Sequence, residues 1–546
     1  MRTSPLIPLK YFLGYNHFMI SIVWEHLFLI IVTTLFLNSG ALLGLTLHVD
    51  SWIVVRWLHD RDITKLKNFY RDVGMPQHAQ ILKLLWCASK NNLRLSGIVL
   101  IIIRILHSIS IYLIIINYLN VNSSVGLLIT LLAIAYPSQV FIHDFQIATQ
   151  YGILWPAFII GVALNVSINS NHLVIELLIL ILSTILTLYS FAMKSILMAS
   201  TFVYGSLFFD NVLVKNEYDL SNAGALCLMV LLPFVYWYLN EKYFPRQGNF
   251  QELNQFLHFS QVMRMLRKIY EGMSKHTFGS IFSSLRIFRN AQIGFLILII
   301  TSLISIFNQP DKSLITENFI NLKLLIIGLL SLLICVFPYA VVDQDFDAVG
   351  YLTKNALMCD ISYGVFITAI IFALAPDNLE VIVFTLLILA GIFYNFTCQY
   401  KLWIQYAKQC ELLSVLQQLP DREDLVFIVQ DCATHKQEGK KSKLYPMTLF
   451  FMANKINRRY TAFGIEGNFV TSKQSFRASK EMYSSALLPQ KKAFFNPKSV
   501  YLIKIEDGFL TPLRVLRFAI EQRTDNPFIN KSHIQLFKIK CNLVNS

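Results

Sequence analysis

Ionisable side chains inside long apolar segments are the residues of this chain that can do chemistry. Each costs about 2.5–3.5 kcal/mol to place in hydrocarbon unless it meets a partner or water. Arg104 and His107 are three residues apart in one apolar segment, so they share a face of a helix. We expect Glu25 to pair with Arg104, either as a structural ion pair that holds the bundle together or to bind a lipid phosphate. The candidate substrate-binding residues are therefore Glu25, Arg104, His107 and Lys194.

Three aspartates, Asp343, Asp345 and Asp347, follow another apolar segment at every second position. The spacing is like the start of an EF-hand calcium loop, but Ala348 and Lys354 stand where that loop needs glycine and glutamate. Paired carboxylates can instead hold a divalent cation against a pyrophosphate. We favour a solvated turn over such a site. Asp343 and Asp345 are kept as candidate catalytic residues, with a divalent cation as the candidate cofactor.

A second group of carboxylates lies just beyond the first apolar segment. It includes Asp50 in "HVDSW" and Asp60 in "LHDRD", and "FIHDFQ" adds His143 and Asp144 farther along the chain. A carboxylate at a membrane exit can act as a general base. Asp50 and Asp60 are therefore the candidate general bases.

The elements that must position these residues are membrane-spanning helices. The chain has 546 residues, of which 55% are hydrophobic and 15% charged, and its mean hydropathy is +0.52. Soluble domains usually carry about 25% charged residues. The apolar residues fall in blocks of roughly 20, the length of a helix that spans a bilayer. Eight scattered cysteines without metal-ligand spacing are read as core residues.

Eleven apolar blocks predict spans near residues 17–37, 97–119, 123–140, 151–168, 172–192, 195–214, 222–240, 291–307, 321–342, 360–375 and 379–398. A twelfth block, 41–58, is interrupted by Asp50 and is a span, a re-entrant segment or an interfacial helix. We prefer twelve spans, because Arg2 and Lys10 then lie in the cytoplasm. The predicted fold is an all-α polytopic transmembrane bundle of 11–12 spans with a small C-terminal α/β or α+β soluble domain.

The distribution of lysine and arginine predicts which loops face the cytoplasm. The segments 56–96 and 241–290 are rich in both residues, and the six spans between them return the chain to its starting side. By the same parity, the aspartate loop and the tail after residue 398 are cytoplasmic. We predict an integral protein of a bacterial inner membrane with its C-terminal domain in the cytoplasm.

Four regions follow from this pattern. They are an N-terminal transmembrane bundle (1–240), a basic amphipathic linker (241–290), the C-terminal transmembrane helices (291–398) and a basic soluble domain (399–546). In the linker, apolar residues between 250 and 273 recur at helical spacing, with Arg264, Arg267 and Lys268 largely off that line. This segment either lies on the inner leaflet or packs under the bundle, and anionic lipid is its expected partner.

The tail after residue 398 combines strand and helix patterns. "LVFIVQD" and "SVYLIKIEDG" are short apolar runs typical of buried strands. "TPLRVLRFAIEQR" predicts a helix with Thr511 as its N-cap and Pro512 in its first turn. Much of the net charge of +14 lies in this tail. We attribute it to the anionic leaflet and expect no nucleic acid partner, because no nucleic-acid motif is present.

Three short segments, "VFPYAVVDQDFDAVGYLTKNALM", "YFPRQGNF" and "LVFIVQD", resemble bacterial polytopic membrane proteins of the surface-polysaccharide or polyprenyl-phosphate-dependent glycosyltransferase type. Gly350 and Tyr351 fit the corner that follows Phe-Pro-Tyr in that class, whereas Lys354 stands where an arginine is expected. The resemblance implies sugar transfer from a polyprenyl-phosphate lipid. It also implies an acidic base in the first loop on the side away from the cytosol, which conflicts with the cytoplasmic placement of 59–95.

We therefore expect an integral membrane protein of cell-envelope glycan assembly that transfers sugar from a lipid-phosphate donor. If it is an enzyme, it is a glycosyltransferase, and its partners are the bilayer and a polyprenyl-phosphate lipid. Two alternatives stay open. One is a transporter or flippase whose polar groups line a path through the bundle, and the other is a scaffold that recruits a partner through its basic tail.

Overall fold

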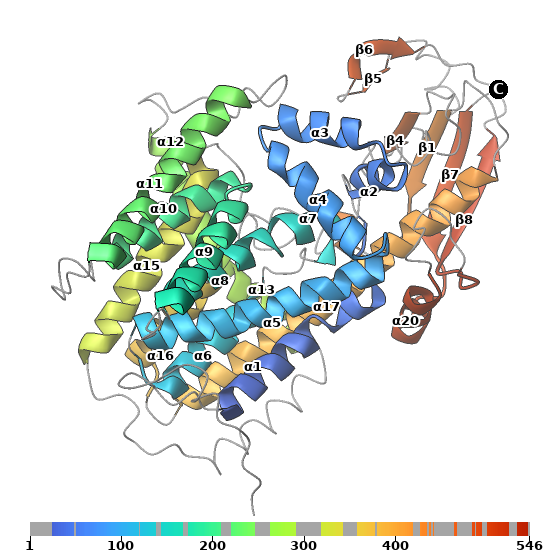
Figure 1. Ribbon diagram of the computed structural model, residues 1–546. Coiled ribbons are helices and arrows are strands. Elements are labelled where there is room, and N and C mark those ends of the chain that lie inside the picture. Colours follow the sequence, from blue (N-terminus) through green and yellow to red (C-terminus); the bar gives the residue numbers. More distant parts are fainter. Residues whose placement is uncertain are drawn as a thin grey trace, which may run out of the picture.

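The computed structural model describes residues 24–47, 51–119, 121–137, 143–166, 173–208, 220–245, 262–290, 318–341, 358–376, 379–418, 426–433, 436–437, 440–441, 463–466, 483–485, 488–493, 500–522 and 532–543 (Figure 1). Most of them are helical. The helices are α1 (Trp24–Leu37), the 3-10 helix η2 (Ser39–Leu43), α2 (Ser51–His59), α3 (Ile63–Asp72), α4 (Pro76–Ala88), α5 (Leu93–Tyr118), α6 (Ser123–Ile134), α7 (Phe145–Gln150), α8 (Leu154–Val166), α9 (Leu173–Ser190), α10 (Lys194–Phe208), α11 (Leu220–Tyr243), α12 (Val262–Ser274), the π-helical turn η7 (Lys275–Gly279), α13 (Ser280–Asn290), α15 (Asn318–Val341), α16 (Asp360–Leu374), α17 (Glu380–Gln417) and α20 (Pro512–Glu521).

Strands occur only near the C-terminal end of the described chain. They are β1 (Val426–Asp431), β2 (Lys436–Gln437), β3 (Lys440–Lys441), β4 (Phe463–Glu466), β5 (Tyr483–Ser485), β6 (Leu488–Ala493), β7 (Val500–Asp507) and β8 (Phe537–Leu543). Four of them form one mixed sheet in the order β4-β1-β7-β8. β1 is parallel to β4 and β7, and β8 is antiparallel to β7. The two strands predicted from the tail are confirmed as β1 and β7.

Helix α20 begins where its sequence predicts. The Thr511 Oγ1 accepts a hydrogen bond from the Arg514 backbone N–H at 3.3 Å, and Pro512 occupies the first turn. Such a cap satisfies one of the N–H groups that a helix start leaves without a partner, and proline at this position loses no bond.

Four described helices are long and apolar enough to cross a membrane: Leu93–Tyr118, Phe145–Val166, Asn321–Ala340 and Glu380–Leu416. Four shorter apolar helices accompany them: Trp24–Leu37, Ser123–Ile134, Val174–Ser190 and Asp360–Leu374. The six spans predicted between residues 97 and 240 each overlap one of the helices α5, α6, α8, α9, α10 and α11. The span predicted at 291–307 lies outside the described residues.

The end of α11 returns to the side of the bundle from which α5 starts. Asn240, in the last turn of α11, donates a side-chain hydrogen bond to the backbone oxygen of Gly74, 3.1 Å away. Gly74 belongs to the turn between α3 and α4, within the basic segment that precedes α5. This placement agrees with the parity predicted for the six spans, and their crossing of the membrane stays a prediction.

The twelfth predicted span, 41–58, is wrong. The described residues form the short η2 and the nine-residue α2 there, and nine residues extend only about 14 Å as a helix. The connecting chain instead pairs at one end of the bundle, where the Leu45 N–H donates to the Leu93 oxygen and the Thr46 N–H to the His143 oxygen.

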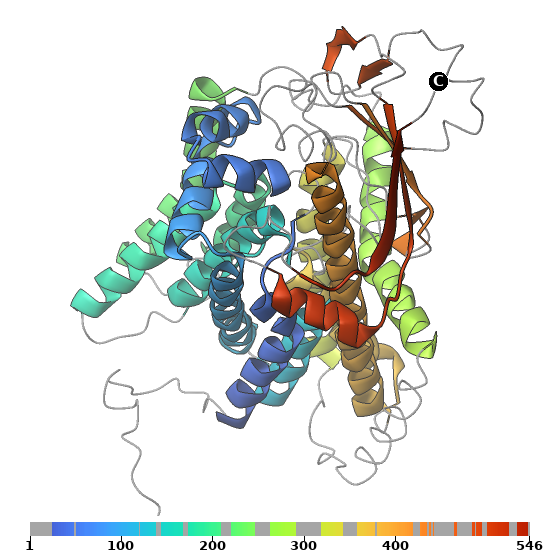
Figure 2. The same ribbon diagram turned by 90° about the vertical axis from the view of Figure 1, so that its right-hand side faces the viewer.

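The helices α2–α4 and the C-terminal sheet share one hydrophobic core with the end of α17 (Figures 1 and 2). Its buried residues include Trp52, Leu66, Leu82, Leu413, Ile503 and Phe537. The basic segment 56–96 and the tail thus lie on the same side of the bundle, as the charge pattern predicts. Which side of the membrane this is stays a prediction.

Part of the predicted amphipathic helix lies outside the described residues, which begin again at 262. Helix α12 buries Ile269 and Gly272 and leaves Met263, Leu266 and Tyr270 exposed. Because these three share a face at helical spacing, the described part carries an exposed apolar stripe. A contact of this face with the inner leaflet stays a prediction.

Candidate functional site

The candidate site is a group of buried polar side chains in the helical bundle, here named the Arg104 cluster. Arg104 is 3% exposed on α5, and His107, one turn later, is 0% exposed. A guanidinium and an imidazole three residues apart on a membrane helix are placed on one face by helical geometry. The cluster is completed by residues from other helices and consists of Arg104, His107, His143, Trp155 and Asp360.

Asp360 supplies the carboxylate of the Arg104 cluster. It is 0% exposed at the first position of α16, and its charge attracts that of Arg104. Its Oδ1 accepts hydrogen bonds from the Trp155 Nε1 at 3.0 Å and from the Ile361 backbone N–H at 2.9 Å. Its Oδ2 lies 3.6 Å from the His107 Nε2, too far for a direct hydrogen bond. The carboxylate is thus oriented by two donors while one oxygen faces the imidazole.

His143 joins the cluster from the loop before α7. Burial, together with the smaller effect of the nearby Arg104 charge, lowers the pKa of His143 from 6.5 to about 4. The imidazole is therefore neutral at pH 7. Its backbone oxygen accepts the Thr46 N–H at 2.9 Å, and this pairing aligns the chain after η2 with the chain before α7.

Ser51 and Asp144 extend this pairing beside the cluster. The Ser51 Oγ donates to the Asp144 Oδ1 at 2.5 Å. Asp144 is also the N-cap of α7, because its side chain accepts the backbone N–H groups of Gln146 and Ile147. Ser51, which follows the candidate general base Asp50 in the chain, is therefore held next to the loop that contributes His143.

Buried nitrogen atoms in the cluster lack hydrogen-bond partners among the described residues. These atoms are the Nδ1 and Nε2 of His107 and the Nδ1 of His143. A buried polar atom without a partner usually costs about 1–3 kcal/mol. Such atoms point to a water, an ion or a ligand group that would satisfy them. The cluster can therefore offer an arginine fork and two imidazoles to an anionic group.

Two predicted site residues, Asp60 and Lys194, lie outside the Arg104 cluster. Asp60 follows α2 as part of a surface pair with Arg56 one turn earlier, and its Oδ1 lies 3.3 Å from the His59 Nδ1. Lys194, the first residue of α10, forms an ion pair with Glu241 of α11. Neither residue belongs to the Arg104 cluster.

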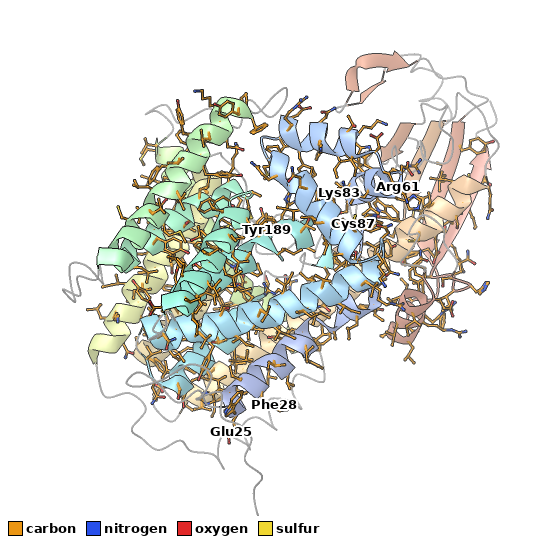
Figure 3. The ribbon with its side chains drawn as sticks, viewed as in Figure 1. Glu25, Phe28, Arg61, Lys83, Cys87 and Tyr189 are labelled. Carbon is orange, nitrogen blue, oxygen red and sulfur yellow. The ribbon has the colours of Figure 1, made fainter. Side chains whose placement is uncertain are left out.

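The predicted pairing of Glu25 with Arg104 is wrong. Glu25 is exposed in the first turn of α1 and forms no ion pair with any described residue (Figure 3). Its neighbour His26 contacts α5 two turns beyond Arg104, where its Nδ1 lies 2.9 Å from the Tyr112 hydroxyl. The antiparallel packing of α1 on α5 therefore sets Glu25 at the far end of the bundle, and the carboxylate near Arg104 comes from α16.

Three predicted catalytic residues, Asp50, Asp343 and Asp345, lie outside the described residues. The divalent cation expected at the last two stays untested with them. Among the residues that the structure does describe, no group of three or more histidine, cysteine, aspartate or glutamate side chains could hold a metal ion.

Sequence reasoning missed Asp360 and Trp155. Asp360 is the polar residue that opens the apolar run 360–375, so the sequence pattern marks it only as the first residue of the span. An acid at the first helical position is a common surface feature, so its burial is visible only in the packed bundle. The Trp155 Nε1–H donates a hydrogen bond, but the sequence does not show which residue lies opposite it in the bundle to accept that bond.

No protein-family model matches this sequence, and no curated protein matches it. Among solved structures, the chain is similar to ArnT from Cupriavidus metallidurans bound to undecaprenyl phosphate, with 12% identity, a TM-score of 0.37, and coverage of 95% of this chain and 98% of that one. The apo form of the same ArnT aligns with 11% identity, a TM-score of 0.33, and coverage of 91% and 94%. A similarity of this size assigns no role to any residue.

The fold and the site together define a class. The protein is a polytopic helical protein with helices apolar and long enough to cross a membrane, a C-terminal sheet packed on its last long helix, and a buried cluster of ionisable groups inside the bundle.

Proposed function

We propose that the protein transfers a sugar from a lipid-phosphate donor during assembly of a cell-envelope glycan, and that Arg104 binds the donor phosphate. The observation that carries this proposal is the burial of Arg104 together with two imidazoles, one of which has no hydrogen-bond partner at either nitrogen within the described chain. Guanidinium groups bind phosphate through paired donors, and they do so most strongly where water is excluded.

A membrane lipid is the phosphate carrier that suits this location. The cluster lies on α5, α16 and the start of α8, all of them apolar helices. A lipid tail can occupy the hydrocarbon beside these helices while its phosphate reaches the cluster. Asp360 offsets the charge of Arg104, because an isolated buried arginine would be costly.

Asp50 is the proposed general base for the acceptor hydroxyl. Its chain neighbour Ser51 is hydrogen bonded to Asp144, next to the loop that supplies His143 to the cluster. A carboxylate in this segment would accept the hydroxyl proton while the bond from the sugar to the phosphate breaks. Asp60, Asp343 and Asp345 are kept as further candidates for this role or for holding a divalent cation.

The test is binding of undecaprenyl phosphate, the lipid in the similar ArnT structure, to the purified full-length protein in detergent. Arg104→Gln should weaken binding at least about tenfold, because loss of a buried charged donor costs about 1.5–3 kcal/mol. Arg104→Lys should restore part of it. The matched control is Arg71→Gln on α3, an exposed arginine outside the Arg104 cluster.

Undecaprenol, which lacks the phosphate, separates phosphate recognition from binding of the tail. If Arg104→Gln keeps its thermal stability and still binds undecaprenyl phosphate like the wild type, the phosphate role of Arg104 is wrong. If Asp50→Asn leaves the envelope glycan profile of cells unchanged while binding is intact, its role as base is wrong. Water-accessible labels at 104 and 107 in the membrane would instead support a transporter or flippase.

A further inference from the structure

Helix α20 of the C-terminal domain carries apolar side chains on two opposite faces. Val515, Phe518 and Ala519 are buried against the domain core. On the other face, Leu513, Leu516 and Ile520 form an exposed apolar stripe, and Phe509, just before the Thr511 N-cap, adds a fourth apolar side chain; the four are 45–78% exposed. The spacing of three and four residues places the three helical side chains along one line. A soluble helix normally turns polar residues outward, so a contiguous apolar stripe marks a contact surface.

This stripe lies where a membrane helix begins. Arg94, in the first turn of α5, donates from its Nη2 to the backbone oxygen of Ile520 at 3.3 Å. The candidate span of α5 starts at Leu93. Farther along the same helix, side chains that face away from the bundle are exposed as on a lipid-facing surface: Leu95, Ile98, Ile102 and Leu106. The end of α20 is therefore held at the level where α5 enters the hydrocarbon.

The orientation of α20 matches a helix that lies in the membrane surface. Figure 2 shows α20 running across the view while α17, which it contacts, runs nearly along the vertical. Figure 1 shows α17 in the plane of the view and α20 nearly end-on below the sheet. α20 is thus crosswise to a candidate spanning helix. Amphipathic helices in this orientation bury their apolar face at the boundary of headgroups and acyl chains.

Two arginines of α20 lie beside the stripe, both on the same side of it. The Arg517 side chain is 74% exposed and lies beside Glu521, and Arg514 stands over the Phe509 ring with 5.4 Å from its guanidinium carbon to the ring centroid. Together with Arg94, they place three guanidinium groups near the apolar line. Basic residues at the rim of an apolar helix face are attracted to the phosphates of anionic lipids.

We propose that α20 is an interfacial helix that docks the C-terminal domain onto the bilayer surface, with Phe509, Leu513, Leu516 and Ile520 inserted among the lipid chains and the flanking arginines bound to anionic headgroups. This inference is independent of the proposed sugar transfer, because it concerns a face of the domain that does not contact the Arg104 cluster.

The test uses spin labels on the full-length protein in vesicles of phosphatidylcholine and phosphatidylglycerol. Labels are attached at Leu513→Cys, at Ile520→Cys and, as a matched control in the same domain, at Lys540→Cys, whose lysine is 66% exposed on β8. The exposed cysteines Cys87, Cys227 and Cys432, and the half-buried Cys541, are first replaced by serine. Collisions with oxygen report lipid, and collisions with a water-soluble nickel complex report water.

We expect the oxygen-to-nickel collision ratio at 513 and 520 to exceed that at 540 at least about threefold, as for side chains below the headgroups. Adding Leu513→Glu to the variant labelled at 520 should reduce its ratio toward the control value. Equal ratios at 513 and 540 would show that the stripe faces water and overturn the proposal. Protection of 513 from both reagents would also overturn it, since a protein surface would then cover the stripe.

Discussion

Single buried histidines carry much of the pH dependence that this structure predicts. His78 on α4 is 0% exposed, and neither ring nitrogen has a hydrogen-bond partner among the described residues. Its ring packs against Tyr70 at 4.8 Å between centroids. Burial lowers the pKa of His78 from 6.5 to about 3. The folded protein therefore keeps this side chain neutral where the unfolded chain protonates it.

The sign of the effect follows from proton binding. Between pH 6.5 and about 3, the unfolded state binds a proton at His78 that the folded state does not bind, so the free energy of unfolding falls as the pH falls through this window. Above pH 6.5 both states are neutral, and the histidine adds no pH dependence.

Replacing His78 with leucine should flatten this dependence. His78→Leu removes the titrating group and two unsatisfied nitrogens, so we expect unchanged or higher stability at pH 7 and a clear gain at pH 5, of order 1–3 kcal/mol. Thermal unfolding of the detergent-solubilised protein between pH 5 and 8 measures both. His59→Leu is the matched control at an exposed histidine. An equal acid sensitivity of His78→Leu and wild type would contradict the burial.

Contacts between helices depend on small residues where two backbones approach closely. Gly364 of α16 faces the backbone of α6, where an added Cβ would lie 2.5 Å from the Ile129 oxygen. Gly391 of α17 faces the backbone oxygen of Ala135 in the same way, and the Asn395 side chain donates to that oxygen at 3.3 Å. Membrane helices gain stability from such close approach, because dispersion contacts replace the hydrophobic effect.

Enlarging Gly364 should therefore separate α16 from α6. For Gly364→Ala we expect a loss of about 1–3 kcal/mol in stability, because backbone atoms must move to admit the methyl group. Gly205→Ala on α10 is the control: its added Cβ meets no atom within 4 Å, so the change should be neutral or stabilising by up to about 1 kcal/mol. Thermal unfolding of both variants under the same conditions measures the two changes in stability. Equal stability of the two would refute the close packing at α16.

The whole molecule is held together by the long helix α17, which runs from the bundle into the C-terminal domain (Figures 1 and 2). At its end, the Glu411 carboxylate accepts the backbone N–H groups of Leu536 and Phe537 at 2.6 and 3.0 Å. Trp52 of α2 donates to Gln409 of the same helix. These bonds tie the basic first-loop helices, the sheet and α17 into one unit on one side of the bundle.

Native cysteines can test this arrangement and its sidedness. Cys87 on α4 (Figure 3) and Cys432 after β1 are both exposed, so an impermeant maleimide should label both from the same side. The lysine and arginine distribution predicts labelling in inverted vesicles and protection in intact cells. Cys227, exposed within the apolar α11, should resist labelling from either side.

Two outcomes have different meanings. Labelling of Cys87 and Cys432 from opposite sides would contradict the shared core of the first-loop helices and the C-terminal sheet. Labelling of both in intact cells would leave the fold in place and refute only the cytoplasmic assignment. In that case the first loop would face the side expected from the glycosyltransferase resemblance.

The sequence by itself determined most of the long apolar helices, the two central strands and the capped start of α20. These follow from local signals: the length of an apolar block, its period, and a threonine before a proline. Arg104 and His107 were found as a pair for the same reason, since helical spacing alone places them on one face.

Only the tertiary structure decided what faces Arg104. Asp360 is 256 positions away in sequence, and no local pattern states that the first residue of α16 lies next to α5 while α1 presents Glu25 at the far end. The failed span at 41–58 has a similar cause, because an apolar block of that length fits either a membrane crossing or short helices buried at one end of the bundle. Packing across the bundle settles such choices, since burial and charge pairing depend on partners that lie far apart in the chain.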